Sequence, residues 1–185
     1  MFEVLITLLV TVIVLIFDLA VFWELVLIVS LVLVLWPAFY AMIKGAPYVP
    51  TRKRDIERML KIGRFKKGER VVELGFGDGR VMRAIEKLGC DVMGYEFSPA
   101  TYWAGRVVHF FKSGKGEMRY GDFWKQDYKE ADVLVCFLLI NAMKDVKEKI
   151  WPNLEPGTRL ISNQFALPGV KEVAREGNVF MYVKK

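Results

Sequence analysis

The stretch that decides the fold is Arg70-Val71-Val72-Glu73-Leu74-Gly75-Phe76-Gly77-Asp78-Gly79-Arg80. Its apolar first half is typical of a β-strand, three glycines follow at alternate positions, and a helix-compatible segment begins at Arg80 and runs to Lys87. This order predicts a strand, a tight turn and a helix N-terminus. Because glycine permits positive φ and has no Cβ, a ligand can approach the backbone there and meet the N–H groups of the helix.

The spacing of the glycines narrows the class of ligand. It is Gly-x-Gly-x-Gly, not the Gly-x-Gly-x-x-Gly of dinucleotide sites, and no Gly-Lys-Ser/Thr of a P-loop follows. Glu73 adds a carboxylate beside the turn, which favours a ligand with positive charge over a nucleotide diphosphate. The pattern acid-x-Gly-x-Gly-x-Gly resembles motif I of class I S-adenosylmethionine-dependent methyltransferases. A purely structural glycine-rich turn is the alternative.

The N-terminal quarter of the chain is a different kind of sequence. Residues 1–43 contain three charged side chains, all acidic, and Leu25–Ile43 is a run of 19 residues without a charge. At about 1.5 Å per residue, this run reaches about 28 Å and can span a hydrocarbon core. No Gly, Pro or Asn separates it from the shorter apolar run at 4–17. We therefore expect one long helix, over about Phe2–Leu35, in preference to a two-span hairpin, a core helix or a cleaved signal peptide.

The basic residues predict how such a helix is oriented. Lys44, Arg52, Lys53 and Arg54 follow the apolar run, so the positive-inside bias predicts a single-pass protein with its C-terminal domain on the cytoplasmic side. The chain beyond residue 43 holds all 27 basic residues and 18 of the 21 acidic ones. This excess predicts an anionic membrane surface as a partner. No compact basic-aromatic cluster favours nucleic acid. The apolar helix also offers a surface for oligomer formation.

Three segments organise the chain: a hydrophobic helix (1–44), a linker with a helix (45–62) and the main domain (63–185). The prolines of Ala46–Thr51 predict an extended linker. Thr51 is expected to cap a helix over Arg52–Ile62 that Gly63 ends. Cys90 and Cys136 lack metal-ligand spacing and are expected to be reduced core thiols, so no metal is predicted.

Further strands and helices alternate after the glycine-rich turn. Strands are predicted over Asp91–Glu96, Gly116–Gly121, Asp132–Leu139, Thr158–Phe165 and Asn178–Val183, and helices over Pro99–Lys112, capped by Ser98, and Ala142–Trp151, started by Asn141. The segment Leu167–Glu176 fits either a short helix or an edge strand. The alternation implies an α/β fold with a mostly parallel sheet and a ligand at the carboxyl ends of its strands.

The helix after Ser98 is rich in aromatic and apolar residues. We expect it to pack on the sheet through Tyr102, Trp103, Val107, Phe110 and Phe111. The only histidine, His109, lies on this helix and is interpreted as a structural or surface residue, not a catalytic base.

Two acids at strand ends are candidate nucleoside ligands. Glu96 ends its strand 23 residues after Glu73 and can accept two hydrogen bonds from a ribose diol, because Ser98 supplies the cap of the next helix. Asp122 follows another strand and can bind an adenine amino group while an aromatic neighbour covers the ring. The alternatives are a solvent-facing acid at Glu96 and an Asx cap at Asp122.

Together these features resemble class I S-adenosylmethionine methyltransferases, and closely the lysine methyltransferases that include the mitochondrial ATP synthase c-subunit enzyme and small archaeal broad-specificity enzymes. The segments that carry the resemblance are Pro47–Thr51, Glu73–Arg80, Ala131–Val133 leading to Phe137–Leu139, and Leu154–Arg159. The resemblance implies a Rossmann-like, seven-stranded domain after the N-terminal helix. It also implies that Tyr48–Thr51 folds over the cofactor. The implied cofactor-binding residues are Tyr48, Thr51, Glu73, Gly75, Phe76, Gly77, Asp78, Gly79, Glu96, Phe97, Gly121, Asp122, Phe123 and Phe137.

Two positions depart from the family pattern. Phe76 stands where a small residue is usual, and Ser162-Asn163-Gln164-Phe165 stands where the family tends to have Ser-His-acid-Phe. The acceptor channel is expected between Tyr48, Phe137, Leu138 and Phe165. Tyr48, Thr51 and Phe137 are the residues expected to position the reacting groups, with no general base.

The expected function is a membrane-anchored N-methyltransferase that acts on lysines of membrane or membrane-associated proteins, with S-adenosylhomocysteine as the second product. The run Phe-Leu-Leu-Ile after the fourth strand replaces the Asn/Asp-Pro-Pro-aromatic motif that clamps nucleobases. The alternatives are a methyltransferase for a lipid, quinone or other small amphiphile, and an inactive membrane-tethered protein that binds the cofactor.

Overall fold

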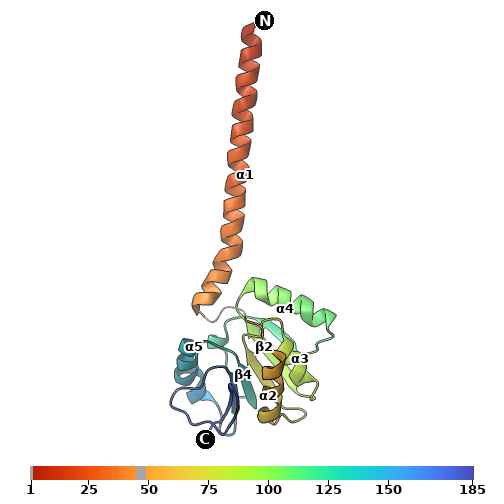
Figure 1. Cartoon of the computed structure of the whole chain (residues 1–185), viewed down its shortest axis with the longest axis vertical. Coiled ribbons are helices and arrows are strands. Elements are labelled where there is room, and N and C mark those ends of the chain that lie inside the picture. Colours follow the sequence, from red (N-terminus) through yellow and green to blue (C-terminus); the bar gives the residue numbers. More distant parts are fainter. Residues whose placement is uncertain (1, 45–48) are drawn as a thin grey trace.

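The longest element of the chain is its N-terminal helix. The computed structural model describes residues 2–44 and 49–185, and α1 (Phe2–Lys44) extends away from the rest of the chain as a single rod (Figure 1). One continuous helix was predicted, but α1 passes the predicted end at Leu35. The residues that follow are uncharged as far as Ile43, and the helix continues through Pro37 although a proline there removes a helical hydrogen bond. Among the described residues, one helical segment, Leu5–Leu33, is long and apolar enough to cross a membrane, judged by length and composition.

The described residues after α1 form a mixed sheet of seven strands in the order β3-β2-β1-β4-β5-β7-β6. The strands are β1 (Arg70–Leu74), β2 (Asp91–Glu96), β3 (Glu117–Tyr120), β4 (Val133–Cys136), β5 (Arg159–Asn163), β6 (Ala174–Glu176) and β7 (Val179–Val183). The first five strands pair in parallel, and β7 runs antiparallel to both β5 and β6. The predicted fold class is therefore confirmed, and the ambiguous segment before β7 contains an edge strand.

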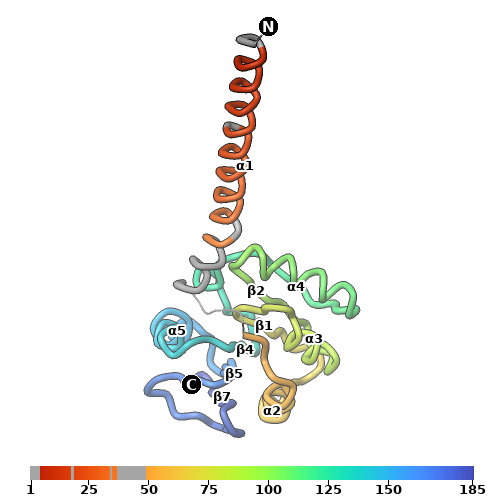
Figure 2. Tube along the Cα trace, turned by 45° about the horizontal axis from the view of Figure 1, so that its top comes forward, coloured from red at the N-terminus to blue at the C-terminus, as the bar shows by residue number. Residues whose placement is uncertain are grey.

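Helices cover both faces of this sheet (Figure 2). On one face lie α2 (Lys53–Gly63) and α3 (Arg80–Glu86), with α4 (Pro99–Phe111) beside β2 and β3. On the other lies α5 (Ile140–Asp145), which continues as η2 (Val146–Ile150) and η3 (Trp151–Asn153). All four residues of β4 are fully buried, as expected for a strand covered on both sides. The chain order reverses between β1 and β4, which is where α/β sheets of this kind bind ligands.

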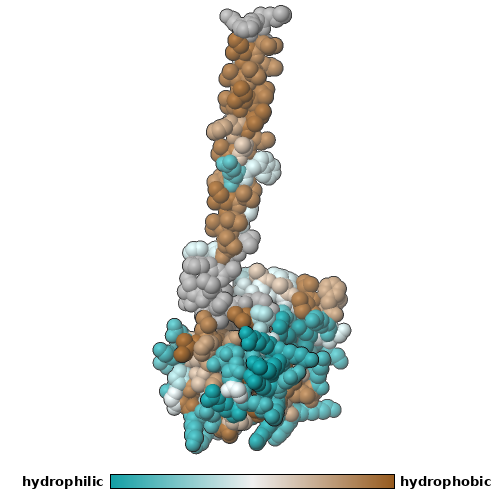
Figure 3. Space-filling view, in the orientation of Figure 1, coloured by the Kyte–Doolittle hydropathy of each residue, from teal (hydrophilic) through white to brown (hydrophobic). Residues whose placement is uncertain are grey.

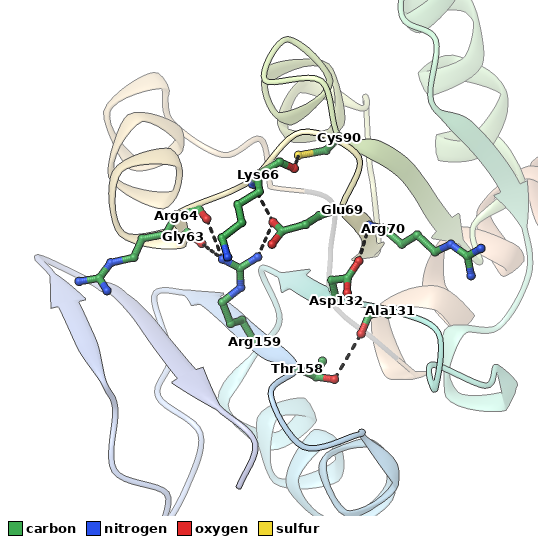
Figure 4. A network of polar contacts seen from close by, with 10 residues as sticks. All are labelled: Gly63, Arg64, Lys66, Glu69, Arg70, Cys90, Ala131, Asp132, Thr158 and Arg159. Carbon is green, nitrogen blue, oxygen red and sulfur yellow. Dashed lines mark hydrogen bonds and ion pairs between the residues drawn. The ribbon is translucent and has the colours of Figure 1, made fainter.

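A polar network closes the amino-terminal edge of the sheet, opposite the ligand-binding edge (Figure 4). The Arg159 guanidinium donates to the carbonyls of Gly63 and Arg64, at 2.9 and 2.7 Å, and pairs with the Glu69 carboxylate. The Arg70 N–H donates to Asp132 at 2.8 Å. This network fixes the C-terminal end of α2 to the sheet, and so holds the whole helix in place over the site at its other end.

Several predicted element ends differ from the structure. Arg52, not Thr51, is the N-cap residue of α2, and Arg64, not Gly63, adopts the left-handed conformation after it, with φ 48°. Gly63 is needed for packing instead, because a Cβ there would lie 2.4 Å from the Phe65 ring. Likewise β4 ends at Cys136, since the chain leaves the sheet before Leu139, and α5 begins at Ile140 without a cap from Asn141.

The prediction that α4 packs through its aromatic and apolar side chains is confirmed for Tyr102, which packs against the core, and is wrong for the other four. Trp103, Val107, Phe110 and Phe111 are 64%, 54%, 80% and 79% exposed, whereas Gly105 and His109 are buried. The reason is a close approach of backbones: a Cβ on Gly105 would lie 2.3 Å from the Gly77 carbonyl oxygen. The helix therefore packs through its glycine face and turns its aromatic face outward. The predicted cap is present, with the Thr101 N–H donating to the Ser98 hydroxyl at 3.4 Å.

Candidate active site

The glycine-rich turn joins β1 to α3 at the carboxyl edge of the sheet. Gly75, Gly77 and Gly79 have φ of 79°, 57° and 71°, so all three need the conformational freedom of glycine. The N–H groups of Gly75 and Phe76 donate to the Tyr95 carbonyl at 2.9 and 3.2 Å, which anchors the turn to β2. A Cβ on Gly75 would meet nothing within 4 Å. The backbone at Gly75 therefore faces open space, in which a ligand can lie against it.

Phe76 does not point into that space. Its side chain is 3% exposed and packs in the core between β2 and α4. A Cβ on Gly94 would lie 3.0 Å from the Phe76 Cβ, and a Cβ on Gly105 would lie 3.0 Å from its ring. Two glycines thus make the room that the large side chain needs. The unusual residue in the turn is accommodated without obstructing the ligand side of the loop.

Glu73 is the residue best suited to a cationic ligand. It is 6% exposed, and its Oε2 atom has no hydrogen-bond partner among the described residues. Burial raises the pKa of Glu73 well above its ordinary value, and the charges of Asp78 and Glu96 add to the rise. A buried acceptor without a partner is costly unless a ligand supplies one. A ligand with an ammonium or sulfonium group fits this requirement, so the residues present fit S-adenosylmethionine.

Glu96 supports the turn and still has acceptor capacity. Its Oε2 accepts from the Gly77 N–H at 3.2 Å and its Oε1 from the Ser98 N–H at 3.0 Å. Burial raises the pKa of Glu96, and these backbone hydrogen bonds partly offset the rise. A carboxylate has about four acceptor sites, and the backbone N–H groups of Gly77, Phe97 and Ser98 occupy part of them, so capacity remains for a ribose hydroxyl. The prediction that Glu96 is left free by Ser98 is therefore only half right.

Asp78 and Arg80 connect the turn to the linker before α2. Asp78 pairs with Arg80 at 2.8 Å, and although burial opposes it, hydrogen bonds from Arg80 lower the pKa of Asp78. Arg80 also donates to the Thr51 carbonyl at 3.2 Å. Thr51 is buried, and this hydrogen bond places it beside the start of α3. Tyr48, predicted for the same role, lies outside the described residues.

The second candidate nucleoside contact follows β3. Gly121 donates to the Glu96 carbonyl at 3.0 Å, so the two strand ends are adjacent. The Asp122 carboxylate accepts from the Trp124 N–H at 3.0 Å and starts η1 (Phe123–Lys125), which is the Asx cap considered as the alternative. Phe123 is buried, with its ring 4.6 Å from that of Trp124. Phe97 is half-buried just beyond β2.

A groove of about 370 Å³ lies beside the turn, where the acceptor channel was predicted. Phe137 and Leu138 from the end of β4 line it together with Phe165 from beyond β5. The predicted walls that the structure describes are therefore brought together. Pro50 and Arg52 also line the groove, and Thr51 between them accepts from Arg80 at the start of α3, so the linker contacts both the groove and the end of the glycine-rich turn. No group of metal-binding side chains occurs among the described residues.

Sequence reasoning missed one polar residue of the groove, Asp55, and did not foresee the buried environment of Asn163 near it. Asp55 lines the groove, is 1% exposed and pairs with Arg58 at 3.0 Å. The sequence did contain a signal for this burial: Asp55 precedes Met59 and Ile62 by four and seven residues, so all three lie on one face of the helix. Asn163, at the end of β5, is fully buried, and neither polar atom of its side chain has a partner among the described residues. The residue after it, Gln164, has φ 73°, which is strained for a residue other than glycine.

Comparison with known sequences identifies related proteins. The sequence profile of the family described as "ANTKMT methyltransferase domain" matches residues 73–174. A protein-lysine N-methyltransferase of Saccharolobus islandicus is 32% identical over 152 residues, which cover 74% of this chain and 92% of that protein. The human lysine N-methyltransferase named for the ATP synthase c-subunit is 30% identical over 66% of this chain. The mouse adenine nucleotide translocase lysine N-methyltransferase is 31% identical over 71% of it. The matches span only 53% and 58% of those two relatives.

Solved structures share the fold of the domain. An RNA methyltransferase from Salinibacter ruber, in complex with S-adenosyl-L-homocysteine, superposes with a TM-score of 0.69 and 26% identity. The superposition covers 74% of this chain and 94% of that one. A structure of MtNAS, in complex with MTA and tNA, superposes with a TM-score of 0.58 at 22% identity and shares the fold.

Proposed function

The chain belongs to the family of ANTKMT methyltransferase domains, whose cofactor is S-adenosylmethionine, and from that premise we propose that it methylates lysine side chains of membrane or membrane-associated proteins. The observation that carries the proposal is the juxtaposition of two spaces at the carboxyl edge of the sheet. One is the open backbone at Gly75 beside the unpaired Glu73 carboxylate oxygen. The other is the groove, which the linker residues Val49 and Pro50 line together with the end of β4.

Positioning and exclusion of water are the contributions of this chain to the reaction. When bound, S-adenosylmethionine supplies a methyl group activated by the sulfonium charge. Glu73 and Glu96 orient the cofactor through its cationic and ribose groups, and the linker at Thr51 covers it. Phe137, Leu138 and Phe165 form the apolar part of the groove wall, which limits water around an amine that is held in line with the methyl group.

The groove suits an uncharged amine as the acceptor. Apolar walls lower the pKa of a lysine that enters, so its ammonium loses a proton to solvent. The groove would then hold the neutral nitrogen in line with the methyl group that the bound cofactor supplies, and S-adenosylhomocysteine would be the leaving group. Asp55 does not oppose this deprotonation strongly, because Arg58 already pairs with it. The curated relatives named for lysine methylation support the same class of acceptor.

Membrane anchoring through α1 is the second part of the proposal. The apolar segment Leu5–Leu33, the uncharged run as far as Ile43 and the basic residues after it support a single pass with the catalytic domain on the cytoplasmic side. An anchor of this kind raises the effective concentration of lysines on proteins in the same membrane.

The first test is methyl transfer by the full chain. Detergent-solubilised protein is incubated with whole membranes and S-adenosylmethionine that carries a radiolabelled methyl group, and the products are separated into protein and organic phases. We expect label in protein bands, at lysines identified by mass spectrometry. Label confined to the organic phase would assign a lipid, quinone or similar amphiphile as the acceptor. Cofactor binding without label in either phase would identify an inactive binding protein.

A matched pair of glycines tests where the cofactor binds. Gly75 and Gly68 have φ of 79° and 82°, and a Cβ on either meets nothing within 4 Å, so Gly→Ala costs the same backbone strain at both. Only Gly75 lies at the proposed site. We expect Gly75→Ala to weaken S-adenosylmethionine binding by about tenfold or more and Gly68→Ala to leave it unchanged, as measured by calorimetry. Equal affinities in the two variants would contradict the proposed site.

A further inference from the structure

The exposed side of α4 is an unusual surface for a helix in an α/β domain. Its outward side chains Trp103, Val107, Phe110 and Phe111 are spaced i, i+4, i+7 and i+8, so they form one stripe, here called the outer face of α4. The stripe lies opposite Gly105 and His109, which pack against the domain. The helix therefore turns its large apolar side chains toward the surroundings and its smallest residue toward the protein.

Contiguous exposed apolar patches mark contacts with membranes, partners or ligands. The four side chains are all more than half exposed, and the two phenylalanines are about four-fifths exposed. In the space-filling view, brown apolar atoms lie at the α4 side of the domain, whereas much of the surface below is teal (Figure 3). Scattered apolar residues need no explanation, but four on one stripe require an apolar environment that the chain itself does not supply.

The position of α4 indicates what that environment is. Helix α4 contacts α1, and α1 approaches the domain on the side where α4 lies (Figure 1). The uncharged run of α1 extends to Ile43, and Lys44, the first basic residue of the chain, is its last residue. If α1 spans a bilayer, the membrane surface therefore falls near its domain end, which is the level of α4.

The charged residues on and after α4 fit the same environment. Arg106 lies on the flank of the helix, and Lys112 and Lys115 follow the two phenylalanines; all three are exposed. A helix that lies in a membrane interface combines an apolar stripe with basic side chains that reach lipid phosphates. Tryptophan is also enriched at that depth, and Trp103 is in the stripe.

We propose that the outer face of α4 inserts into the headgroup region of the bilayer that α1 spans, as a second membrane contact. This inference rests on the proposed membrane anchoring. Two contacts fix the domain against the membrane where one helix would leave it free to rotate. The exposed Leu139 and Ile140, at the carboxyl edge beside the groove, then face the same surface, so the groove accepts lysines that lie close to the lipid headgroups.

Quenching by labelled lipid tests the contact directly. A fluorophore is attached to Phe111→Cys in a Cys90→Ser background, where the remaining Cys136 is fully buried. The full chain is reconstituted in phosphatidylcholine–phosphatidylglycerol vesicles that contain a lipid with a nitroxide quencher. Glu130→Cys is the matched control, because its side chain is 86% exposed near the opposite edge of the sheet. We expect several-fold stronger quenching at position 111 than at position 130; equal quenching overturns the proposal.

Flotation of the vesicles separates this inference from the proposal on which it rests. A chain that does not float with the vesicles counts against membrane anchoring by α1. A chain that floats while the label at position 111 remains unquenched overturns only the inference about α4. Energy transfer between labels on two copies, insensitive to the quenching lipid, would assign the outer face to a second copy and also overturn it.

Activity offers a second, independent measurement. We expect Phe110→Gln/Phe111→Gln to lower transfer to acceptors embedded in vesicles by about tenfold, because the domain is then held less closely to the membrane, and to leave transfer to a soluble lysine peptide unchanged. Val173→Gln removes a side chain that is 61% exposed elsewhere and serves as the control. Unchanged transfer to both acceptors in the double variant contradicts the proposal. Retained cofactor affinity shows that the variant is folded.

Discussion

At the scale of single residues, the buried carboxylate of Glu73 is the most informative group in the molecule. A buried acid with a partnerless oxygen destabilises the free protein, since it is either ionised without compensation or protonated at a raised pKa. A buried carboxylate of this kind is expected at a binding site, where the ligand supplies the missing partner. Because a cation stabilises the carboxylate form, binding of the cofactor and loss of the Glu73 proton are thermodynamically linked.

This linkage gives the first prediction. Below the raised pKa of Glu73, binding of S-adenosylmethionine releases a proton, so the affinity rises with pH by up to about tenfold per unit and levels off above that pKa. Glu73→Gln keeps the shape of the side chain but cannot ionise, so its affinity should be lower and should lack this rise. Calorimetry between pH 5 and pH 9 measures both curves. Parallel curves for the two proteins would exclude Glu73 as the cation partner.

The glycine-rich turn and the positions of the acids at strand ends were predictable, because short stretches of the sequence indicate both. The pattern around Gly75 fixes a turn, and strand ends then bring Glu96 and Gly121 beside it. The setting of Phe76 was not predictable, because it depends on Gly94 and Gly105, which are separate in the sequence. Asp55 was missed because a single acid on a helix is usually solvated, although its spacing with Met59 and Ile62 places it on the buried face of α2.

At the scale of secondary-structure elements, α4 and the glycine-rich turn act as one unit. The helix packs on the Gly77 carbonyl through Gly105, while the Phe76 ring fills the space that Gly105 and Gly94 leave. The N–H of Gly77 in turn binds Glu96. A displacement of α4 therefore reaches the cofactor site by direct backbone contact.

Gly105→Ala tests this unit. Alanine normally stabilises a helix interior by about 1 kcal/mol relative to glycine. Here its Cβ would lie 2.3 Å from the Gly77 carbonyl oxygen, so we expect a net loss of about 1–3 kcal/mol in the free energy of unfolding, together with weaker cofactor binding. Urea denaturation in detergent and calorimetry measure the two effects. Arg106→Ala, at the exposed neighbouring position, is the control and should change neither. A stabilised Gly105→Ala variant would refute the close packing.

Element types were more predictable than their ends or orientation. The alternation of strands and helices predicted a mostly parallel sheet. The fully apolar run of β4 predicted a strand inside it, because a strand buried on both faces has no polar positions. The orientation of α4 was predicted wrongly for four of its large apolar side chains, because apolar side chains were assumed to face the core. For a helix beside a membrane that assumption reverses, and the exposed phenylalanines mark the exception.

At the scale of the whole molecule, two unlike parts are joined at one end. An apolar rod with three acidic and no basic residues before Lys44 meets a domain that holds all 27 basic residues from Lys44 onward. The rod buries none of its apolar segment against the domain. The apolar helix is stable in an apolar medium and the charged domain is stable in water. Both conditions are met at a membrane surface, which is the basis for the proposed anchoring.

Extraction tests this arrangement. The full chain should remain in the membrane fraction after alkaline carbonate and after 1 M salt, because its attachment is apolar and not electrostatic. Ile28→Lys/Val32→Lys places two charges on the rod, each costing about 3 kcal/mol near the centre of a span, and should make the chain extractable. Release of the unaltered chain by carbonate would contradict the anchor.

The length of the rod has a mechanical consequence. From Leu5 to Ile43 the helix measures about 58 Å, against about 30 Å for the hydrocarbon core, so an upright helix extends well beyond the core. Tilting reduces this mismatch and lowers one flank of the domain toward the lipid while lifting the other. Since α4 is in contact with the rod, the flank that carries α4 is the one expected to descend. Bilayer thickness would thereby set how far the acceptor groove stands above the membrane, and a thinner membrane would draw it closer.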